Sequence, residues 1–502
     1  MDLGYERLAR RYRLERKFPF HTSRLTDGLR RTEHLEDQEI DYYLPGYQPE
    51  DSDVGHLVFA LKYDGVELDL LKGIFEKMDL SSLTLAIQAQ PFSKYLRRLW
   101  FLCEWLLNCT LPIPNLEQGN YVDLLDADRY FSHFHRRSQR HRVNVNTLFD
   151  SHVWCPVIRK SRTLADFIQE HLTARTYAMR DNFDPTLLAR AVNYLYTKET
   201  RSSFLIEHEE AGPTREARFL DLLERAPGLD NLNKEVLLNL QNVIVDPRFA
   251  DNDYRENQVY VAAITGYYQN RIHYIAPPAE GVECMMAALL QGTHTLVEGI
   301  RAGTLDLDPV VVAALVSFSF VYIHPFNDGN GRLHRFLIHY VLARSGFTPP
   351  DLIVPVSAAI WRDPRGYDQA LEVYSKPVMR AINYQEDVDG QVTLSPQMSD
   401  HYRYPDLTRQ AEELYRWVKT AIDEDLWREV KLIERLDRAR RRIRDEVVEM
   451  PDRLERLFMN LCLQHKGVIS KAKRPQFAKL TDDEITRMEA IFQAEVLSED
   501  AR

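Results

Sequence analysis

The chain has 502 residues, enough for two to four domains and a sizeable buried core. Hydrophobic residues make up 44% and charged residues 28%, the ordinary balance of a globular protein. The 64 Lys and Arg against 75 Asp and Glu give a formal net charge of −11. This acidic balance argues against sequence-independent nucleic-acid binding by the whole chain, although not against a local basic patch.

Residues 1–160 form a mixed region. Apolar residues recur at helical spacing in 68–77 and 92–107, whereas 143–146 and 153–157 are typical of short extended pieces. We find no motif that carries chemistry in this region, so its role stays unassigned.

Residues 161–385 show one helical pattern after another, interrupted by a short hairpin or extended flap over 267–278. Gly346 suits a left-handed helix C-cap, and Pro349 and Pro350 would prevent the helix from continuing. The expected helices are 163–171, 185–196, 215–224, 234–243, 283–302, 309–323, 331–345 and 364–374.

Residues 386–400 are polar and predict a linker, and 401–502 is again helical. Six arginines gather within 435–444. A nucleic-acid contact is one interpretation, but the flanking acidic residues favour a solvated helix face with ion pairs. The fold class is therefore mainly α, with a helical core, a small β-hairpin flap, a mixed N-terminal region and a helical C-terminal region.

The five cysteines are odd in number, and none pairs with histidines at zinc-ligand spacing, which predicts reduced thiols in a cytoplasmic protein. The first residues lack the pattern of a signal peptide. The most apolar run, 309–323, is shorter than the ~20 residues of a spanning helix. We expect it to be a buried core helix, with no membrane partner.

Residues 324–335 read His-Pro-Phe-Asn-Asp-Gly-Asn-Gly-Arg-Leu-His-Arg. Gly329 and Gly331 can bring the main chain close to a ligand where the loop opens into a helix, so that N–H groups converge on phosphate oxygens. The Asn330 amide is a further candidate donor. Arg332 and Arg335 share one face of that helix, and guanidinium groups match phosphate oxygens in paired hydrogen bonds.

Asp328 supplies a carboxylate beside the phosphates, and Mg²⁺ typically takes one or two carboxylates together with phosphate oxygens. His324 has an unperturbed pKa near ~6.5, so it can accept the proton of an attacking hydroxyl at neutral pH. Phe326 is expected to anchor the loop in the core.

The pattern His-x-Phe-x-(Asp or Glu)-Gly-Asn-Gly-Arg-x-x-Arg resembles the signature of the Fic family. The resemblance covers about 185–380 and implies a Fic-type (Fido) helical fold. It also implies transfer of AMP from ATP to a Ser, Thr or Tyr hydroxyl of a protein substrate, and the chain itself is one candidate substrate. It makes His324 the catalytic base, Arg332 the β/γ-phosphate ligand, Arg335 the γ-phosphate ligand and Asp328 the metal ligand.

The resemblance places the nucleotide along 328–335, including Leu333 and His334, although the His334 side chain lies off the pattern and is expected to be structural. It places Tyr367 near the nucleotide base. The strand with Arg271, Ile272, His273 and Tyr274 would form a flap to which an extended target segment adds as a strand; a purely structural hairpin is the alternative.

One class of Fic proteins carries an inhibitory helix with the pattern (Ser or Thr)-x-x-x-Glu-(Gly or Asn). Ser203 and Glu207 fit its first two elements within a helix near 189–209, and the resemblance implies that Glu207 pairs with Arg335. His208 departs from the pattern. The alternative is an ordinary charged helix end.

Three other functions stay open. The same site could remove AMP or use another nucleotide such as UTP, and the chain could be a nucleotide-responsive module that binds protein or DNA. The sequence also leaves a homodimer open.

Overall fold

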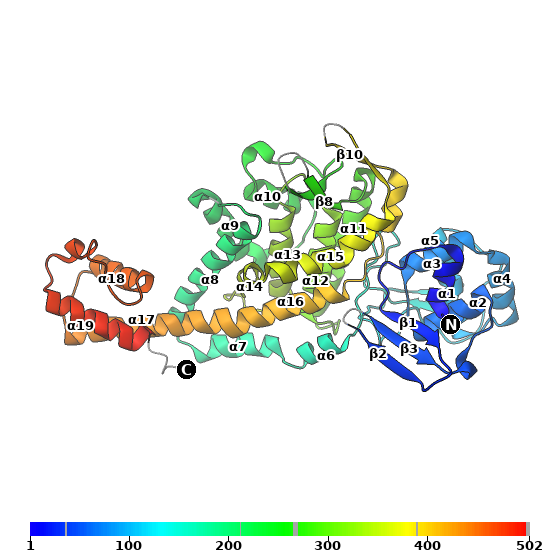
Figure 1. The fold of residues 1–502 in the computed structure, drawn as a ribbon, viewed down its shortest axis with the longest axis horizontal. Helices are drawn as coiled ribbons and strands as arrows, with labels where there is room; N and C mark the ends of the chain where they lie inside the picture. The colour runs from blue at the N-terminus through cyan, green and yellow to red at the C-terminus, as the bar shows by residue number, and fades with distance from the viewer. Residues whose placement is uncertain (36–37, 211, 265–269, 388–389, 498–502) are drawn as a thin grey trace.

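The protein is mainly α-helical, which confirms the predicted fold class. The computed structural model describes residues 1–35, 38–210, 212–264, 270–387 and 390–497. Three parts follow one another along its longest axis (Figure 1): an N-terminal part, a large helical core and a pair of C-terminal helices. The domain boundaries at 160, 385 and 400 stay predictions, because the largest hydrophobic cluster runs from Phe131 to Val430 and crosses all three.

The N-terminal part joins helices to two small sheets and has its own hydrophobic cluster, which includes Leu99 and Trp100 of α5. In one sheet β3 lies between β1 (parallel) and β2 (antiparallel), and in the other β6 lies between β4 (parallel) and β5 (antiparallel). The elements are α1 (Gly4–Tyr12), β1 (His21–Leu25), β2 (Arg31–His34), β3 (Glu39–Tyr43), α2 (Asp53–Tyr63), α3 (Leu68–Lys77), α4 (Leu80–Ala89), α5 (Lys94–Leu107), β4 (Val122–Asp123), β5 (Arg136–Ser138) and β6 (Val143–Val145).

The core is built around α12, which packs against α11, α13 and α16. Asp308 caps α12 by accepting hydrogen bonds from the N–H groups of Val310 and Val311. From Val310 to Ile323 all residues except Val321 are buried, as predicted for a core helix. The core elements are α6 (Arg162–Ile168), α7 (Leu172–Asn182), α8 (Pro185–Ile206), α9 (Pro213–Arg225), α10 (Lys234–Ile244), α11 (Ala279–Arg301), α12 (Pro309–Ile323), α13 (Asn330–Arg344), α14 (Val356–Arg362) and α15 (Pro364–Ala381).

All eight helices expected between 161 and 385 are present, but α8 continues to Ile206 instead of ending near 196. The polar run after Tyr196 is typical of a helix end. In the fold, Glu199 and Ser203 are buried, so tertiary contacts stabilise a stretch whose composition predicts a loop. Gly346 has φ 73°, as expected for a left-handed C-cap.

The expected hairpin is formed by β7 (Tyr260–Ile264) and β8 (Asn270–Ile275), which pair antiparallel. Residues 267–269, where the flap was expected to start, lie outside the described residues. The predicted linker is partly structured: β9 (Tyr384–Glu386) pairs with β10 (Val392–Leu394), and a 3₁₀ turn over Pro396–His401 follows.

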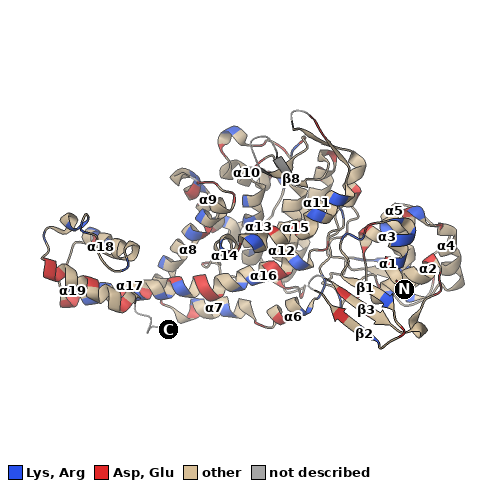
Figure 2. Ribbon diagram, in the orientation of Figure 1, with Lys and Arg blue, Asp and Glu red and all other residues tan. Residues whose placement is uncertain are grey.

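At the C-terminal end, α16 (Thr408–Thr420), a π-helical turn (Ala421–Leu426) and α17 (Trp427–Glu446) form one long helix, against whose far end α18 (Asp452–Gln464) and α19 (Asp482–Phe492) lie (Figure 1). Both charge signs occur along α17 (Figure 2). Arg438 pairs with Glu434 at 3.1 Å and Arg442 with Glu446 at 2.6 Å, and both also pair with Glu495. These ion pairs agree with the solvated-face interpretation. Within the described ranges, no helix combines the length and the apolarity needed to span a bilayer.

At the contact between α11 and the N-terminal part, we expect replacement of a glycine by alanine to lower stability, which is the reverse of the usual effect in a helix. Glycine inside an exposed helix normally costs stability relative to alanine. At Gly292, however, an added Cβ would collide with the buried ring of Phe149. We expect Gly292→Ala to lower the free energy of unfolding by about 1–3 kcal/mol in chemical denaturation. Gly281→Ala is the control on the same helix, because its Cβ would come no closer than 3.3 Å to the Ser399 side chain and 3.7 Å to Met285. A Gly292→Ala variant as stable as the wild type would contradict this packing.

Candidate functional site

The loop that joins α12 to α13 is braced by its own side chains. Asn330 Oδ1 accepts a hydrogen bond from the N–H of Phe326 (3.1 Å), and its Nδ2 donates to the Phe326 carbonyl (2.8 Å). Phe326 is fully buried and packs on Tyr254, which confirms its expected anchoring role. The Asn330 side chain is therefore committed to the loop. The bond to Phe326 uses one of the two Nδ2 hydrogens, so the expected donation to phosphate stays a prediction.

Gly329 caps the N-terminus of α13 with φ 87°, a left-handed conformation that an L-residue adopts only at a cost. The loop thus turns sharply into the helix and leaves the first N–H groups of α13 beside the signature residues. An N-terminus of this kind favours anions.

His324 ends α12 with φ 52°. Its Nδ1 lies 3.2 Å from the carbonyl of Val321, a group that can only accept, so Nδ1 carries the proton and Nε2 keeps a free lone pair. Burial, reinforced by the nearby cation of Arg255, lowers the pKa of His324 to about 4. The imidazole is therefore a neutral base at physiological pH.

Arg255 is a site residue that the sequence analysis missed. Its guanidinium group donates to the carbonyls of His324 (2.7 Å) and Pro277 (2.6 Å), and its backbone N–H donates to Pro325 (2.8 Å). Burial lowers its pKa to about 10. Arg255 fixes the backbone at the base, yet no motif marks it, because it lies about 70 positions before His324 in an irregular segment.

Arg335 is completely buried and is held by the end of α8. Its Nε donates to Ser203 Oγ (2.9 Å), its Nη2 donates to the Ser203 carbonyl (2.7 Å), and its Nη1 forms an ion pair with Glu207 Oε1 at 2.8 Å. The structure thus brings together the three residues that the inhibitory pattern linked.

Glu207 also lies directly over the start of α13, where a Cβ added to Gly331 would collide with its carboxylate. The carboxylate therefore takes the position that the dipole and free N–H groups of α13 make favourable for an anion. Its side chain stays about one-third exposed.

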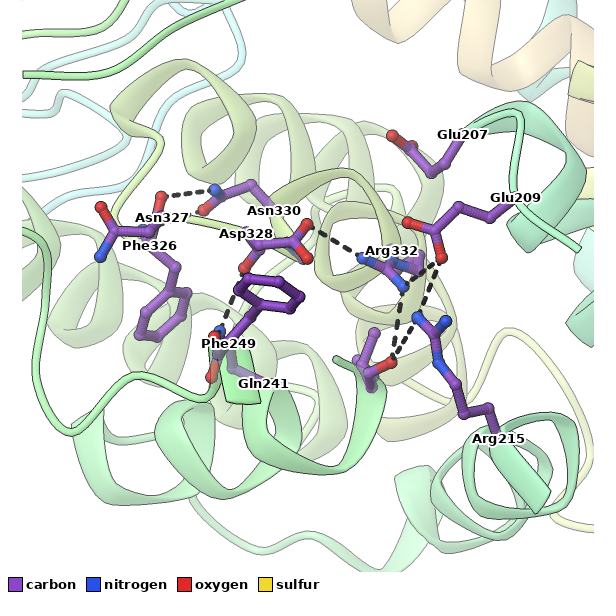
Figure 3. Close-up of polar contacts among 12 residues, drawn as sticks. Glu207, Glu209, Arg215, Gln241, Phe249, Phe326, Asn327, Asp328, Asn330 and Arg332 are labelled. Carbon is purple, nitrogen blue, oxygen red and sulfur yellow. Dashed lines mark hydrogen bonds and ion pairs between the residues drawn. The ribbon is translucent and has the colours of Figure 1, made fainter. Parts of the chain in front are cut away.

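Arg332 is also buried, and it contacts two carboxylates (Figure 3). Its Nη2 lies 3.0 Å from Asp328 Oδ1, and its Nη1 lies 3.0 Å from Glu209 Oε2. Glu209 was not expected at the site, because it lacks a Ser or Thr four residues before it. The inhibitory pattern therefore could not identify it.

Asp328 is the candidate metal ligand. Its side chain is about half exposed, and its Oδ1 accepts from the N–H of Gly329 (2.6 Å) as well as from Arg332. In the part of the chain that the structure describes, no three acidic, histidine or cysteine residues converge on one point. The residues therefore fit a cation that obtains its other ligands from phosphate and water, as Mg²⁺ does.

The remaining predicted nucleotide contacts are buried. Leu333 and His334 are fully buried, and the His334 ring packs on Phe318, so only their main chains could reach a ligand. Tyr367 packs between His334 and Trp417, and burial raises its pKa to about 12. Tyr367 also interacts electrostatically with Arg335 and Glu207, so its expected place near the nucleotide base stays a prediction.

Some side chains of the flap strand β8 are buried in the core, and others lie at the surface. Tyr274 is buried and donates to the Tyr322 carbonyl (2.6 Å), so its side chain anchors the strand. Docking of a target segment through the main chain of β8 stays a prediction. Ile272 is half-buried and His273 is exposed. Arg271 belongs to β8 through its pairing with Ala263, and its side chain lies outside the described residues.

Comparison with known proteins places this site in a family. Residues 231–342 match the model of the Fic/DOC family. Protein adenylyltransferase fic-1 of Caenorhabditis elegans is 47% identical over 53 residues, 11% of this chain and 10% of the relative. Protein adenylyltransferase Fic of Drosophila yakuba is 36% identical over 111 residues, 22% of this chain and 19% of the relative. The chain thus spans a tenth to a fifth of these relatives' length.

A crystal structure of a Fic domain containing signaling protein from Bacteroides thetaiotaomicron is 18% identical, over 53% of this chain and 97% of that one. The TM-score is 0.39, which is too low for the superposition to add to the assignment. The family match therefore rests on sequence, and it includes the loop, the base and both signature arginines. The chain thus contains a region, residues 231–342, that matches the Fic/DOC family.

Proposed function

We propose that this protein transfers AMP from ATP to a protein hydroxyl, and that Glu207 restrains the reaction. The observation that supports the proposal best is the position of a neutral histidine base beside an anion-binding helix start with two buried arginines. The adenylyltransferase names of the relatives agree with it.

In the proposed reaction, His324 Nε2 accepts the proton of the attacking hydroxyl as its oxygen bonds to the α-phosphorus. The bond from that phosphorus to the bridging oxygen breaks, and pyrophosphate leaves. Arg332, Arg335 and the first N–H groups of α13 stabilise charge on the leaving group. Mg²⁺, held by Asp328, would add charge neutralisation on the phosphates.

The restraint follows from the Arg335 contacts. A γ-phosphate and the Glu207 carboxylate cannot both pair with the same guanidinium edge, so Glu207 would keep ATP from its productive position. Ser203 would hold Arg335 in the orientation that Glu207 needs.

The departure at His208 has a structural explanation. The N–H of His208 donates to the Leu205 carbonyl and the N–H of Glu209 donates to the Phe204 carbonyl, which together form a Schellman motif at the end of α8. The central residue of this motif must be left-handed, and His208 has φ 57°. Gly and Asn tolerate this conformation best. His208 therefore retains the turn, but at a conformational cost.

We expect Glu207→Gly to raise AMP incorporation, measured by intact mass after incubation with ATP and Mg²⁺. A hydrogen bond to a charged group contributes roughly 1.5–3 kcal/mol, so the increase should be about tenfold or more. Glu210→Gly, at an exposed position in the same loop, is the matched control and should resemble the wild type. The double variant Glu207→Gly/His324→Ala should remain unmodified. A wild type as active as Glu207→Gly would refute the restraint, and no adduct with any variant would refute AMP transfer.

The pH profile tests the base. With a pKa of about 4, His324 stays neutral down to mildly acidic pH, and removing Glu207 lowers its pKa further, because that carboxylate favours the charged ring. We expect the rate of the Glu207→Gly variant to change less than about twofold between pH 8 and pH 5.5. A histidine with a pKa near ~6.5 would instead lose about tenfold over this range, and that result would contradict the assignment.

His208→Gly should relieve the left-handed strain and stabilise the turn by about 1 kcal/mol. We therefore expect slower hydrogen exchange at the amide of Glu209, together with a lower rate of AMP incorporation. His294→Gly is the opposite control, because glycine at this exposed helical position should lower the free energy of unfolding by about 1 kcal/mol. Faster exchange at Glu209 in His208→Gly would show that the histidine side chain itself supports the turn.

A further inference from the structure

We propose that Arg215 is a third phosphate-binding arginine of this site and that Glu209 is the carboxylate that a nucleotide phosphate displaces from it. The inference rests on the proposed function, since it takes the ligand to be a nucleoside triphosphate. Arg215 lies on α9, outside the signature and outside the residues that match the family model.

Arg215 and Arg332 share the same two acceptors. Arg215 Nη2 lies 2.9 Å from Glu209 Oε2, and Arg332 Nη1 lies 3.0 Å from the same oxygen. Both nitrogens also face the Ile244 carbonyl, at 3.3 and 3.4 Å. Figure 3 shows these contacts converging between the two side chains. A phosphate oxygen that replaced Glu209 Oε2 on Arg332 would therefore be within reach of Arg215.

Phe204 holds the pair of arginines in place. The guanidinium carbons of Arg215 and Arg332 lie 5.3 and 5.5 Å from the centroid of its ring, within the range of cation–π contact. Phe204 is buried and packs edge-on against Phe219 of α9. The Phe204 ring thus orients both guanidinium groups without using the N–H groups that contact Glu209.

The charges of the two arginines favour replacement of the Glu209 carboxylate by another anion over its departure alone. Two guanidinium groups this close repel each other unless an anion lies between them. Arg215 Nε is buried and has no hydrogen-bond partner among the residues that the structure describes, so Glu209 does not satisfy the group completely. A phosphate group offers more acceptor oxygens than a carboxylate and matches paired guanidinium groups.

The position of Glu209 would allow its side chain to move away from the two arginines. It follows the left-handed residue of the Schellman motif, and its side chain is about one-third exposed, whereas that of Arg332 is almost completely buried. Rotation of one glutamate side chain would free both arginines while leaving α8 intact. Glu209 would thus compete with the nucleotide at Arg332, separately from the competition of Glu207 at Arg335.

The test measures nucleotide affinity in the full chain carrying His324→Ala, so that no turnover interferes. We expect Arg215→Ala to weaken MgATP binding about tenfold in calorimetry and to leave AMP binding unchanged, because AMP lacks the terminal phosphates. Glu209→Gln should tighten MgATP binding several-fold by removing the competing charge. Arg225→Ala, an exposed arginine on the same helix, is the matched control and should change neither affinity.

A double variant distinguishes two roles of Arg215: direct binding of phosphate, or only holding Glu209 in place. If Arg215 binds phosphate, Arg215→Ala must still weaken MgATP binding in the Glu209→Gln background. If Arg215 only holds Glu209, the effect vanishes there, and that result would overturn the inference, as would equal losses for ATP and AMP. AMP transfer by Glu207→Gly with unchanged ATP affinity in Arg215→Ala would refute this inference alone. Selective ATP loss without any transfer would refute only the proposed reaction.

Discussion

The whole site depends on two buried arginines that need anions. Arg332 and Arg335 lie on the first turns of α13, with at most 1% of either residue exposed. A buried charge is tolerated only when it is paired and hydrogen-bonded. In the structure, carboxylates supply the partners, and in the proposed reaction phosphates would replace them. The same requirement therefore accounts for both the observed ion pairs and the proposed binding of a nucleotide.

One helix end delivers both carboxylates. The Schellman motif that terminates α8 places Glu207 just before its left-handed residue and Glu209 just after it. Glu207 therefore reaches Arg335 and the start of α13, while Glu209 reaches Arg332 and Arg215. A single change of backbone at His208 would alter both contacts, which couples the two halves of the proposed restraint.

The rest of the core holds this arrangement in place. Glu199, one turn before Ser203 on α8, pairs with His339 of α13 at 2.6 Å and accepts from the N–H of Ser357 at 2.8 Å. This buried contact joins α8 to α13 and to α14. Because α13 carries the arginines and α8 carries the glutamates, their relative position sets whether the ion pairs can form.

The sequence by itself determined the mainly helical fold, the position of α12 and the residues of the loop from His324 to Arg335. These depend on local signals: apolar periodicity, glycines where the backbone must turn, and charges at fixed spacing. Glu207 could also be identified, since its pattern is contained in six neighbouring residues. The continuation of α8 beyond Tyr196 could not, because its polar residues are stabilised by partners distant in the chain.

Only the tertiary structure decided which groups meet. Arg255 reaches the base from about 70 residues away, Arg215 and Glu209 reach Arg332 from more than 100, and Tyr367 and Tyr274 turn into the core. A sequence records side-chain chemistry and local spacing, but burial and long-range pairing arise from how the helices pack. Those contacts, and not the motif alone, lower the pKa of His324 and place a second carboxylate at the buried arginines of α13.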